Sequence, residues 1–211
     1  MSTAGDQSRA VRPRRVRSLS ERRPVSLIVV GCSLGGLQAL QVILKGLPAG
    51  FQIPIAVAQH RHPKSSEVLA QHLQRSSTLE ISDAEDLQPI ESGHIYLAPA
   101  NYHLVVDRGS LRLSVDDAVQ YSRPSIDVLF DSAADSYRQR AVGVVLTGAN
   151  TDGANGARRI REHGGLILVQ DPKEAEAPVM PEAAIAATTP SAVLTLVQIT
   201  EYLTDRLEYE I

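Results

Sequence analysis

The chain has 211 residues, of which 43% are hydrophobic and 21% are charged, and its formal net charge is −3. These values are typical of one soluble globular domain with a sizeable core, and no apolar run approaches the length of a membrane span. A single cysteine excludes an intrachain disulfide framework and is compatible with a reducing compartment.

The first 24 residues differ from the rest of the chain. Residues 1–23 hold seven arginines and two acidic residues, a net charge of +5, which leaves −8 for residues 24–211. Because this segment has almost no apolar residues, we expect a disordered basic tail or linker over 1–24 and one folded domain over 25–211. The segment does not read as a secretory signal. No basic patch interleaved with aromatics follows, so nucleic-acid binding is not expected.

The folded part opens with a strand, a glycine turn and a helix. The apolar run over 25–30 predicts a buried strand, the sequence Gly-Cys-Ser-Leu-Gly-Gly over 31–36 predicts a tight turn, and apolar residues then recur at helical spacing. Ser33 lies in this turn, where the carboxyl end of a strand meets a helix N-terminus. Its neighbour Cys32 reads as a small buried residue rather than a reactive thiol.

Three interpretations of Ser33 stay open at this point. Serine is a common helix N-cap. A serine at a strand end is also placed to act as a nucleophile, and residues 31–35 fit the pattern G-x-S-x-G. The third interpretation is a dinucleotide-binding turn in which Ser33 replaces the second glycine. The expected second strand ends without the acidic residue that such a turn needs for ribose.

Further elements follow in alternating order. We expect strands over 53–58, 94–98, 141–147 and 166–169, and a hairpin of 103–106 and 111–115 around a four-residue loop at 107–110. Helices are expected from 65, from 126 with Ser125 as N-cap, over 153–163, from 181 and over 197–208, while 76–93 reads as a polar loop. This order predicts an α/β fold: a mostly parallel, doubly wound sheet covered on both faces, with the hairpin inserted.

Three residues of complementary chemistry fall at the ends of three expected strands: Ser33, His60 and Asp152. The carboxyl ends of parallel strands share one edge, so these residues can meet. A serine hydroxyl needs a base such as imidazole to take its proton, and the imidazole needs a carboxylate to fix its tautomer. His62 is a rival base, and Asp152 also reads as the N-cap of the next helix. No histidine shows the spacing of metal ligands, so no metal is expected.

Several motifs taken together resemble the catalytic domain of the chemotaxis receptor methylesterases, the CheB family. The similar stretches are Gly31–Gly36, Gln59-His60, Ser122–Phe130, Thr147–Ala154, Gly164-Gly165 with Gln170-Asp171, and Met180-Pro181.

The resemblance implies a three-layer α/β/α domain that hydrolyses glutamate methyl esters on the cytoplasmic helices of chemoreceptors and releases methanol without metal or cofactor. Many relatives also deamidate receptor glutamines. By motif, Ser33 is the nucleophile, His60 the base and Asp152 the orienting acid, while His62 falls outside the motif. The implied location is the cytoplasm, with no insertion into the membrane.

The resemblance also implies an oxyanion hole made by the backbone N–H groups of Leu34 and Ala149. The family usually has a small residue or threonine at the first of these positions and methionine at the second, so the shape of the pocket is expected to differ. Arg123 is expected either to contact an acidic substrate helix or to be a surface or helix-entry residue.

One family feature is missing from the sequence. Members typically carry an N-terminal phosphorylatable receiver domain, and the roughly 24 residues before the expected domain are too few for one. Two further hypotheses therefore remain beside the chemoreceptor methylesterase. One is a stand-alone serine esterase of the same fold with another substrate, and the other is a non-catalytic regulatory or nucleotide-binding module.

Overall fold

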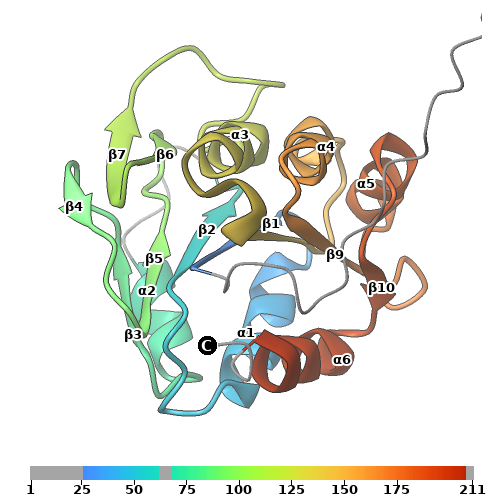
Figure 1. Cartoon of the computed structure of the whole chain (residues 1–211), viewed down its shortest axis with the longest axis horizontal. Coiled ribbons are helices and arrows are strands. Elements are labelled where there is room, and N and C mark those ends of the chain that lie inside the picture. Colours follow the sequence, from blue (N-terminus) through green and yellow to red (C-terminus); the bar gives the residue numbers. More distant parts are fainter. Residues whose placement is uncertain (1–25, 62–67, 208–211) are drawn as a thin grey trace, which may run out of the picture.

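The computed structural model describes residues 26–61 and 68–207 (Figure 1). Within these residues the main sheet has seven strands in the order β10-β9-β8-β1-β2-β5-β3, and all its neighbouring strands are parallel. The strands of this sheet are β1 (Leu27–Cys32), β2 (Ile55–Gln59), β3 (Glu80–Asp83), β5 (His94–Leu97), β8 (Ala141–Val145), β9 (Leu166–Gln170) and β10 (Ala192–Leu194).

Helices cover both faces of this sheet, as Figure 1 shows. One face carries α3 (Ile126–Tyr137), α4 (Ala154–Glu162) and α5 (Val179–Ala187). The other carries α1 (Gly36–Gly46), α2 (Val68–Gln74) and α6 (Leu196–Glu201). A short 3₁₀ turn, η2 (Arg138–Arg140), follows α3, and a π-helical turn, η3 (Tyr202–Arg206), follows α6. The predicted three-layer α/β/α architecture is confirmed.

The buried central strands explain the apolar runs of the sequence. Side chains of β1 alternate between the two faces, so that Ile28 and Val30 pack with the core under α1 and α6, whereas Leu27 and Val29 pack with the core under α3 and α4. Because both faces are covered, all six residues of this strand are buried. The strand extends to Cys32, two residues beyond its predicted end.

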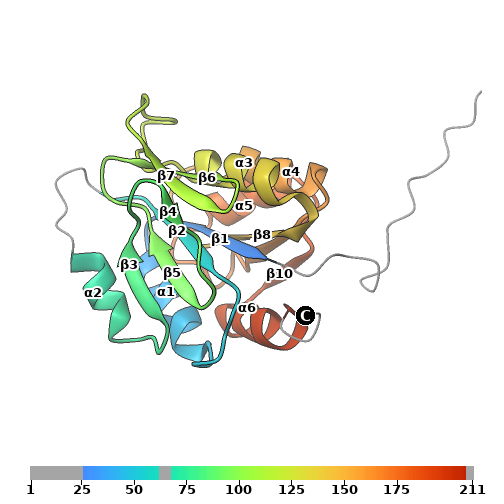
Figure 2. The ribbon, with the colours of Figure 1, turned by 60° about the vertical axis from the view of Figure 1, so that its left-hand side comes forward.

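The predicted hairpin is present but lies in a second, smaller sheet. This antiparallel sheet has the order β4-β7-β6, from β4 (Gln88–Pro89), β6 (His103–Asp107) and β7 (Ser110–Ser114), and it sits beside α3 (Figure 2). The prediction of a four-residue loop is wrong. Asp107 pairs with Ser110, so the turn contains only Arg108 and Gly109, both with positive φ, as a two-residue hairpin turn requires.

The two outer strands of the main sheet, β3 and β10, were not predicted from the sequence. The stretch 76–93, read as a loop, contains β3 and β4, and β10 was not predicted. Edge strands are short and half-exposed, so they lack the apolar run that reveals a central strand. Helix α5 begins at Val179, two residues before its predicted start. The predicted tail over 1–24 and the start of the helix expected from 65 lie outside the described residues.

The path of the chain through the sheet creates a topological switch point beside β1. The chain passes from β1 to β2 and outward to one edge of the sheet, then returns to β8 on the other side of β1. In open α/β sheets, sites form at the carboxyl ends of the strands where the direction of winding reverses. The loops that follow β1, β2 and β8 therefore surround the crevice where a site is expected.

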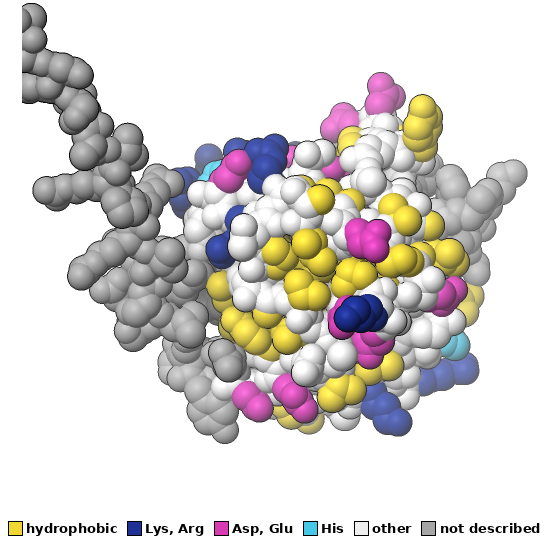
Figure 3. All heavy atoms as spheres, turned by 90° about the vertical axis from the view of Figure 1, so that its right-hand side faces the viewer, with side chains coloured by type: hydrophobic (Ala, Val, Ile, Leu, Met, Phe, Trp, Pro, Cys, Tyr) yellow, Lys and Arg dark blue, Asp and Glu magenta, His cyan; other side chains and the backbone are white. Residues whose placement is uncertain are grey.

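The opposite edge of the sheet, at β10, carries exposed apolar side chains. Val179 of α5, Val193 of β10 and Val197 of α6 are all exposed. Figure 3 views the molecule from this side and shows apolar side chains interspersed with a few charged ones. Within the described residues, no helix is long and apolar enough to cross a membrane.

Candidate active site

The ends of β1, β2 and β8 bring two of the predicted site residues next to each other. Cys32 and Gln59 are register partners, so Ser33 and His60 are the next residues on adjacent strands. The His60 N–H donates to the Cys32 carbonyl at 3.0 Å, and the Ser33 N–H donates to the Thr147 carbonyl at 2.9 Å. Main-chain hydrogen bonds thus hold the three loops together at the switch point.

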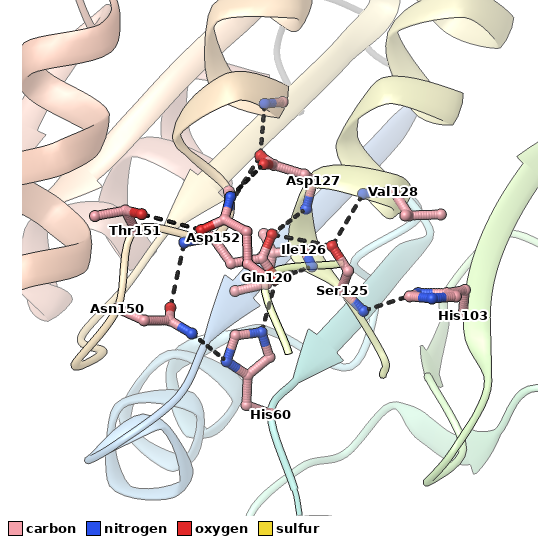
Figure 4. A network of polar contacts seen from close by, with 12 residues as sticks. His60, His103, Gln120, Ser125, Ile126, Asp127, Val128, Asn150, Thr151 and Asp152 are labelled. Atoms are coloured by element: carbon pink, nitrogen blue, oxygen red, sulfur yellow. Dashed lines mark hydrogen bonds and ion pairs between the residues drawn. The ribbon is translucent and has the colours of Figure 1, made fainter. Parts of the chain in front are cut away.

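His60 and Asp152 form the centre of a polar network (Figure 4). His60 Nε2 lies 2.8 Å from Asp152 Oδ2, and the Asp152 side chain has no exposed surface. The same carboxylate accepts three further hydrogen bonds, from the Ile126 N–H (2.7 Å), the Asp127 N–H (3.0 Å) and the Ser125 hydroxyl (3.0 Å). The predicted His–Asp contact is present, and the carboxylate is fixed from several sides.

Asn150 determines which nitrogen of His60 carries the proton. Its Oδ1 accepts the Asp152 N–H at 3.2 Å, so its amide nitrogen faces His60 Nδ1, at 3.3 Å. An amide nitrogen only donates, and His60 Nδ1 must therefore accept. The proton is then on Nε2, which donates to the Asp152 carboxylate. The neutral imidazole consequently has its lone pair at Nδ1, where it accepts from Asn150.

The ionised form of Asp152 is favoured despite its burial. Burial alone raises the pKa of this carboxyl group. Hydrogen bonds from His60 and from the backbone N–H groups of Asp127 and Ile126 outweigh that effect and hold the pKa below its ordinary value. A carboxylate in this environment remains charged at neutral pH and stabilises a positive charge on the adjacent imidazole.

Asp152 and Asp127 cap each other's helices. The sequence suggested Asp152 as N-cap of the helix over 153–163, but the N-cap of α4 is Gly153, which has φ 96° and makes no side-chain cap. Asp152 instead binds the first two N–H groups of α3, and Asp127 binds the N–H groups of Gly153 (2.9 Å) and Gly156 (2.8 Å) of α4. Each carboxylate therefore satisfies backbone donors of the neighbouring helix.

The ionised form of Asp127 is less favoured than that of Asp152. Burial raises its pKa above the ordinary value, and the charge of Asp152 contributes to the rise, although hydrogen bonds from Gly156, Asn155 and Gly153 act in the opposite direction. All the groups that contact the Asp127 carboxylate are donors, since Gln120 and Asn155 also present amide nitrogens, at 3.1 and 3.3 Å.

Replacing Asp127 by alanine should destabilise the fold by roughly 2 kcal/mol or more, because two backbone N–H groups at the start of α4 lose their acceptor in the interior. The matched variant Asp127→Asn keeps one acceptor oxygen for both backbone groups, although its NH₂ faces the Gln120 and Asn155 amides, so it should lose less than the alanine variant. Urea unfolding followed by circular dichroism measures both differences. Equal stability of the alanine variant and the wild type would contradict the capping role of Asp127.

Ser33 is not the N-cap of α1, so the helix-cap interpretation is wrong. The cap position is Gly35, with φ 77° and no side-chain hydrogen bond. Ser33 is half-buried, and within residues 26–61 and 68–207 its hydroxyl makes no hydrogen bond, to His60 or to any other group. The structure therefore pairs His60 with Asp152 directly and leaves the Ser33 hydroxyl unbonded on the next strand.

Thr147 fixes the loops on either side of Ser33. Its hydroxyl donates to the Leu34 carbonyl at 2.9 Å and accepts the Ala177 N–H at 2.8 Å. The Leu34 and Ala149 N–H groups, the predicted oxyanion donors, have no acceptor within the described part of the chain. Both lie in exposed loops at the mouth of the crevice, so they remain available to a ligand.

Cys32 is part of the core rather than the site. Its side chain is fully buried, and burial raises the pKa of the thiol to about 12. The thiol packs against α1, since a Cβ added to Gly36 would lie 2.7 Å from its Sγ. Glycine at position 36 therefore allows the helix to start close to the strand, next to Ser33.

Arg123 lines a cavity of about 300 Å³ beside His60. Its guanidinium donates to Asn101 Oδ1 from Nε and Nη2 (3.2 and 2.8 Å) and to the carbonyls of Val115 and Asp116 from Nη1 (2.7 and 2.8 Å). In this arrangement Arg123 connects the chain's own loops, which agrees with the helix-entry interpretation. The expectation that it contacts a substrate stays a prediction.

Asn150 and Asp127 are among the residues of the network that were not singled out from the sequence. Asn150 has a detectable signal, because an asparagine two residues before an aspartate commonly folds back on the backbone. Asp127 appears in the sequence only as a first-turn acid, and its contact with α4 depends on tertiary packing. His62 lies outside the described residues. Within the described ranges, no group of His, Cys, Asp and Glu is arranged to hold a metal ion.

A parallel α/β domain with a buried His–Asp pair next to a serine at its switch point has the elements expected of a serine esterase. The chain belongs to the CheB methylesterase family, because the sequence pattern of that family matches residues 28–203. The family resemblance read from the sequence is therefore confirmed, and the Gly31–Gly36 turn is part of a methylesterase domain.

Relatives cover most of this chain. A Leptospira interrogans protein, named for protein-glutamate methylesterase and protein-glutamine glutaminase activities, is 45% identical over 175 residues, 82% of this chain and 91% of the relative. A Rhodospirillum rubrum protein-glutamate methylesterase/protein-glutamine glutaminase is 39% identical over 92% of this chain, which spans only 52% of that protein. The crystal structure of the Thermotoga maritima CheB methylesterase catalytic domain matches with a TM-score of 0.81 and 32% identity, covering 86% of this chain and 98% of the domain.

Proposed function

We propose that this chain hydrolyses glutamate methyl esters in proteins and releases methanol, with Ser33, His60 and Asp152 as its catalytic residues. The observation that carries the proposal is the His60–Asp152 pair, because His60 follows β2 at the position beside Ser33 on the neighbouring strand end. Family membership and the names of the relatives support the same substrate class.

The reaction begins when Ser33 Oγ attacks the ester carbonyl and its proton passes to His60 Nδ1. In the structure without substrate, Nδ1 accepts a hydrogen bond from the Asn150 amide. The Ser33 hydroxyl therefore has to replace this amide at Nδ1 when the ester binds. The imidazolium that forms keeps its hydrogen bond from Nε2 to the negatively charged Asp152. The proton on Nδ1 then moves to the departing methoxide, which leaves as methanol. The glutamyl group remains on the enzyme as an ester of Ser33.

The Leu34 and Ala149 N–H groups are the donors we assign to the oxyanion. Charge on the carbonyl oxygen develops only as the tetrahedral intermediate forms, so donors fixed in advance favour the transition state over the substrate. Thr147 supports this function by holding the Leu34 peptide through its carbonyl. Removing one such donor lowers rates by roughly 10²–10³ in other acyl-transfer enzymes.

Water completes the cycle by the same steps in reverse. His60 Nδ1 takes a proton from water, the hydroxide attacks the glutamyl ester, and Ser33 leaves with that proton, which yields a free glutamate side chain. A glutamine substrate follows the same route with ammonia as leaving group, in keeping with the two activities in the relatives' names. We propose chemoreceptor cytoplasmic helices as the protein substrate, and the cytoplasm as the location.

The test is methanol release from a methylated chemoreceptor cytoplasmic fragment, with ammonia release from the same fragment carrying glutamines. We expect methanol from the wild-type chain and none from the variant without the Ser33 hydroxyl. A fluorophosphonate probe reports the reactivity of Ser33 without a natural substrate. Labelling of Ser33 together with an absence of methanol would show an active serine esterase whose substrate is not this protein ester.

A further inference from the structure

A tight turn at the edge of the crevice carries an unusual backbone conformation. Val119 and Ser122 pair through both main-chain hydrogen bonds, at 2.9 and 3.2 Å, so the turn contains only Gln120 and Tyr121. Their φ angles are 47° and 63°. Two successive left-handed residues are typical of turns built from asparagine and glycine, and neither residue here is one of them.

The first residue of the turn is anchored to the catalytic network. Gln120 Nε2 donates to Asp127 Oδ2 at 3.1 Å, and Gln120 Oε1 accepts the Thr151 hydroxyl at 3.0 Å. Figure 4 shows this amide lying between the α3 N-terminus and the loop that carries Asp152. These hydrogen bonds offset the unfavourable backbone conformation of Gln120. They do not explain why a tyrosine occupies the next position, which is also left-handed.

Tyr121 does nothing for the fold in this position. Its side chain is fully exposed, and within the described residues it makes no hydrogen bond or ring contact. An aromatic ring held in water on a left-handed residue contributes no burial and raises the energy of the turn. Such a combination points to a contact that the isolated chain does not contain.

The position of the ring relates it to the site. Tyr121 lines the same cavity of about 300 Å³ as His60, together with Arg61 and Arg123. Arg61 is paired with Asp83 and Arg123 donates to the chain's own loops, whereas the Tyr121 ring has no partner within the described residues. The ring is therefore the group at this cavity that a polypeptide lying across it would contact. Tyrosine suits such a contact because it offers a large rigid area at little conformational entropy.

We propose that Tyr121 is a specificity-determining residue that docks the polypeptide carrying the glutamate ester against the cavity beside His60. This inference rests on the proposed function and concerns how the protein substrate is held, not the bond that is broken. We expect a small ester to react at Ser33 without using the ring, whereas a protein substrate also extends over the cavity that the ring lines.

The test compares protein and small substrates in the variant Tyr121→Asn. Asparagine tolerates the left-handed conformation, so the turn remains while the ring is lost. We expect KM for the methylated receptor fragment to rise about tenfold with kcat unchanged. The rates of p-nitrophenyl acetate hydrolysis and of fluorophosphonate labelling of Ser33 should stay at the wild-type value. Tyr121→Phe, which keeps the ring, should restore the wild-type KM.

Leu87 provides the matched control, because it is 64% exposed, has a φ of 62° and does not line the cavity. Leu87→Asn should leave KM unchanged. A wild-type KM in Tyr121→Asn, or an equal loss with protein and small substrates, would overturn the docking role alone. Absence of methanol from the wild type, with Ser33 still labelled, would overturn the proposed substrate and this inference together.

Discussion

Ser33→Ala should lower kcat for methyl ester hydrolysis by roughly 10⁴-fold or more and abolish labelling by the fluorophosphonate probe. In the proposed mechanism this hydroxyl forms the covalent bond to the substrate, so its removal takes away the attacking group. Because the hydroxyl makes no hydrogen bond within the described residues, its loss should change the free energy of unfolding very little.

Ser76→Ala is the matched control for this experiment. Ser76 is half-buried like Ser33, but it precedes β3 and so lies at the amino end of the sheet, away from the crevice. We expect wild-type activity and labelling from this variant. Methanol release and mass spectrometry of the labelled chain measure both quantities. Substantial residual activity in Ser33→Ala would mean that a different group attacks the ester.

Asp152→Asn should lower kcat by roughly 10³–10⁴-fold and also destabilise the fold by about 1–3 kcal/mol. All four groups around this carboxylate donate hydrogen bonds, from His60, Ile126, Asp127 and Ser125. An amide places an NH₂ group against at least one of these donors. If it faces His60, the imidazole proton moves to Nδ1, where the base needs a lone pair.

The pH dependence of stability gives a second measurement on the same variant. The folded-state pKa of Asp152 is lower than its ordinary value, so the unfolded chain binds the proton more readily. The stabilisation is therefore fully present above about pH 4, the pKa of an unperturbed aspartate, and is lost as the pH falls through the lower folded value. The wild type should lose stability in this acid range more steeply than Asp152→Asn. Parallel pH profiles of the two unfolding free energies would contradict this assignment.

The central part of the fold could be read from the sequence because it is buried on both faces. Strands β1, β2 and β8 give apolar runs, and the turns after β1 and β8 are rich in glycine. Ser33 and His60 follow β1 and β2 at this switch point. The edge strands β3 and β10 could not be read in this way, since a short half-exposed strand depends on its neighbour rather than on its own pattern.

The sequence is sufficient to name candidate residues for the site, but not to predict the contacts between them. Strand ends and chemistry selected Ser33, His60 and Asp152, and the family resemblance gave them roles. The exchange of caps between α3 and α4 could not be foreseen, because a carboxylate at a helix start usually serves its own helix. The contact between Asn150 and His60 likewise depends on the approach of two loops from separate strands.

The mutual capping of α3 and α4 by Asp152 and Asp127 limits which positions of this domain can change during evolution. Asp152 and Asp127 close the starts of two packed helices, so changes at either position alter folding and chemistry together and are difficult to tolerate. Within the described residues, Tyr121 is joined to this network through its neighbour Gln120. New partners can therefore be acquired by altering the tip of one turn, while the inherited core that breaks the ester bond is left intact.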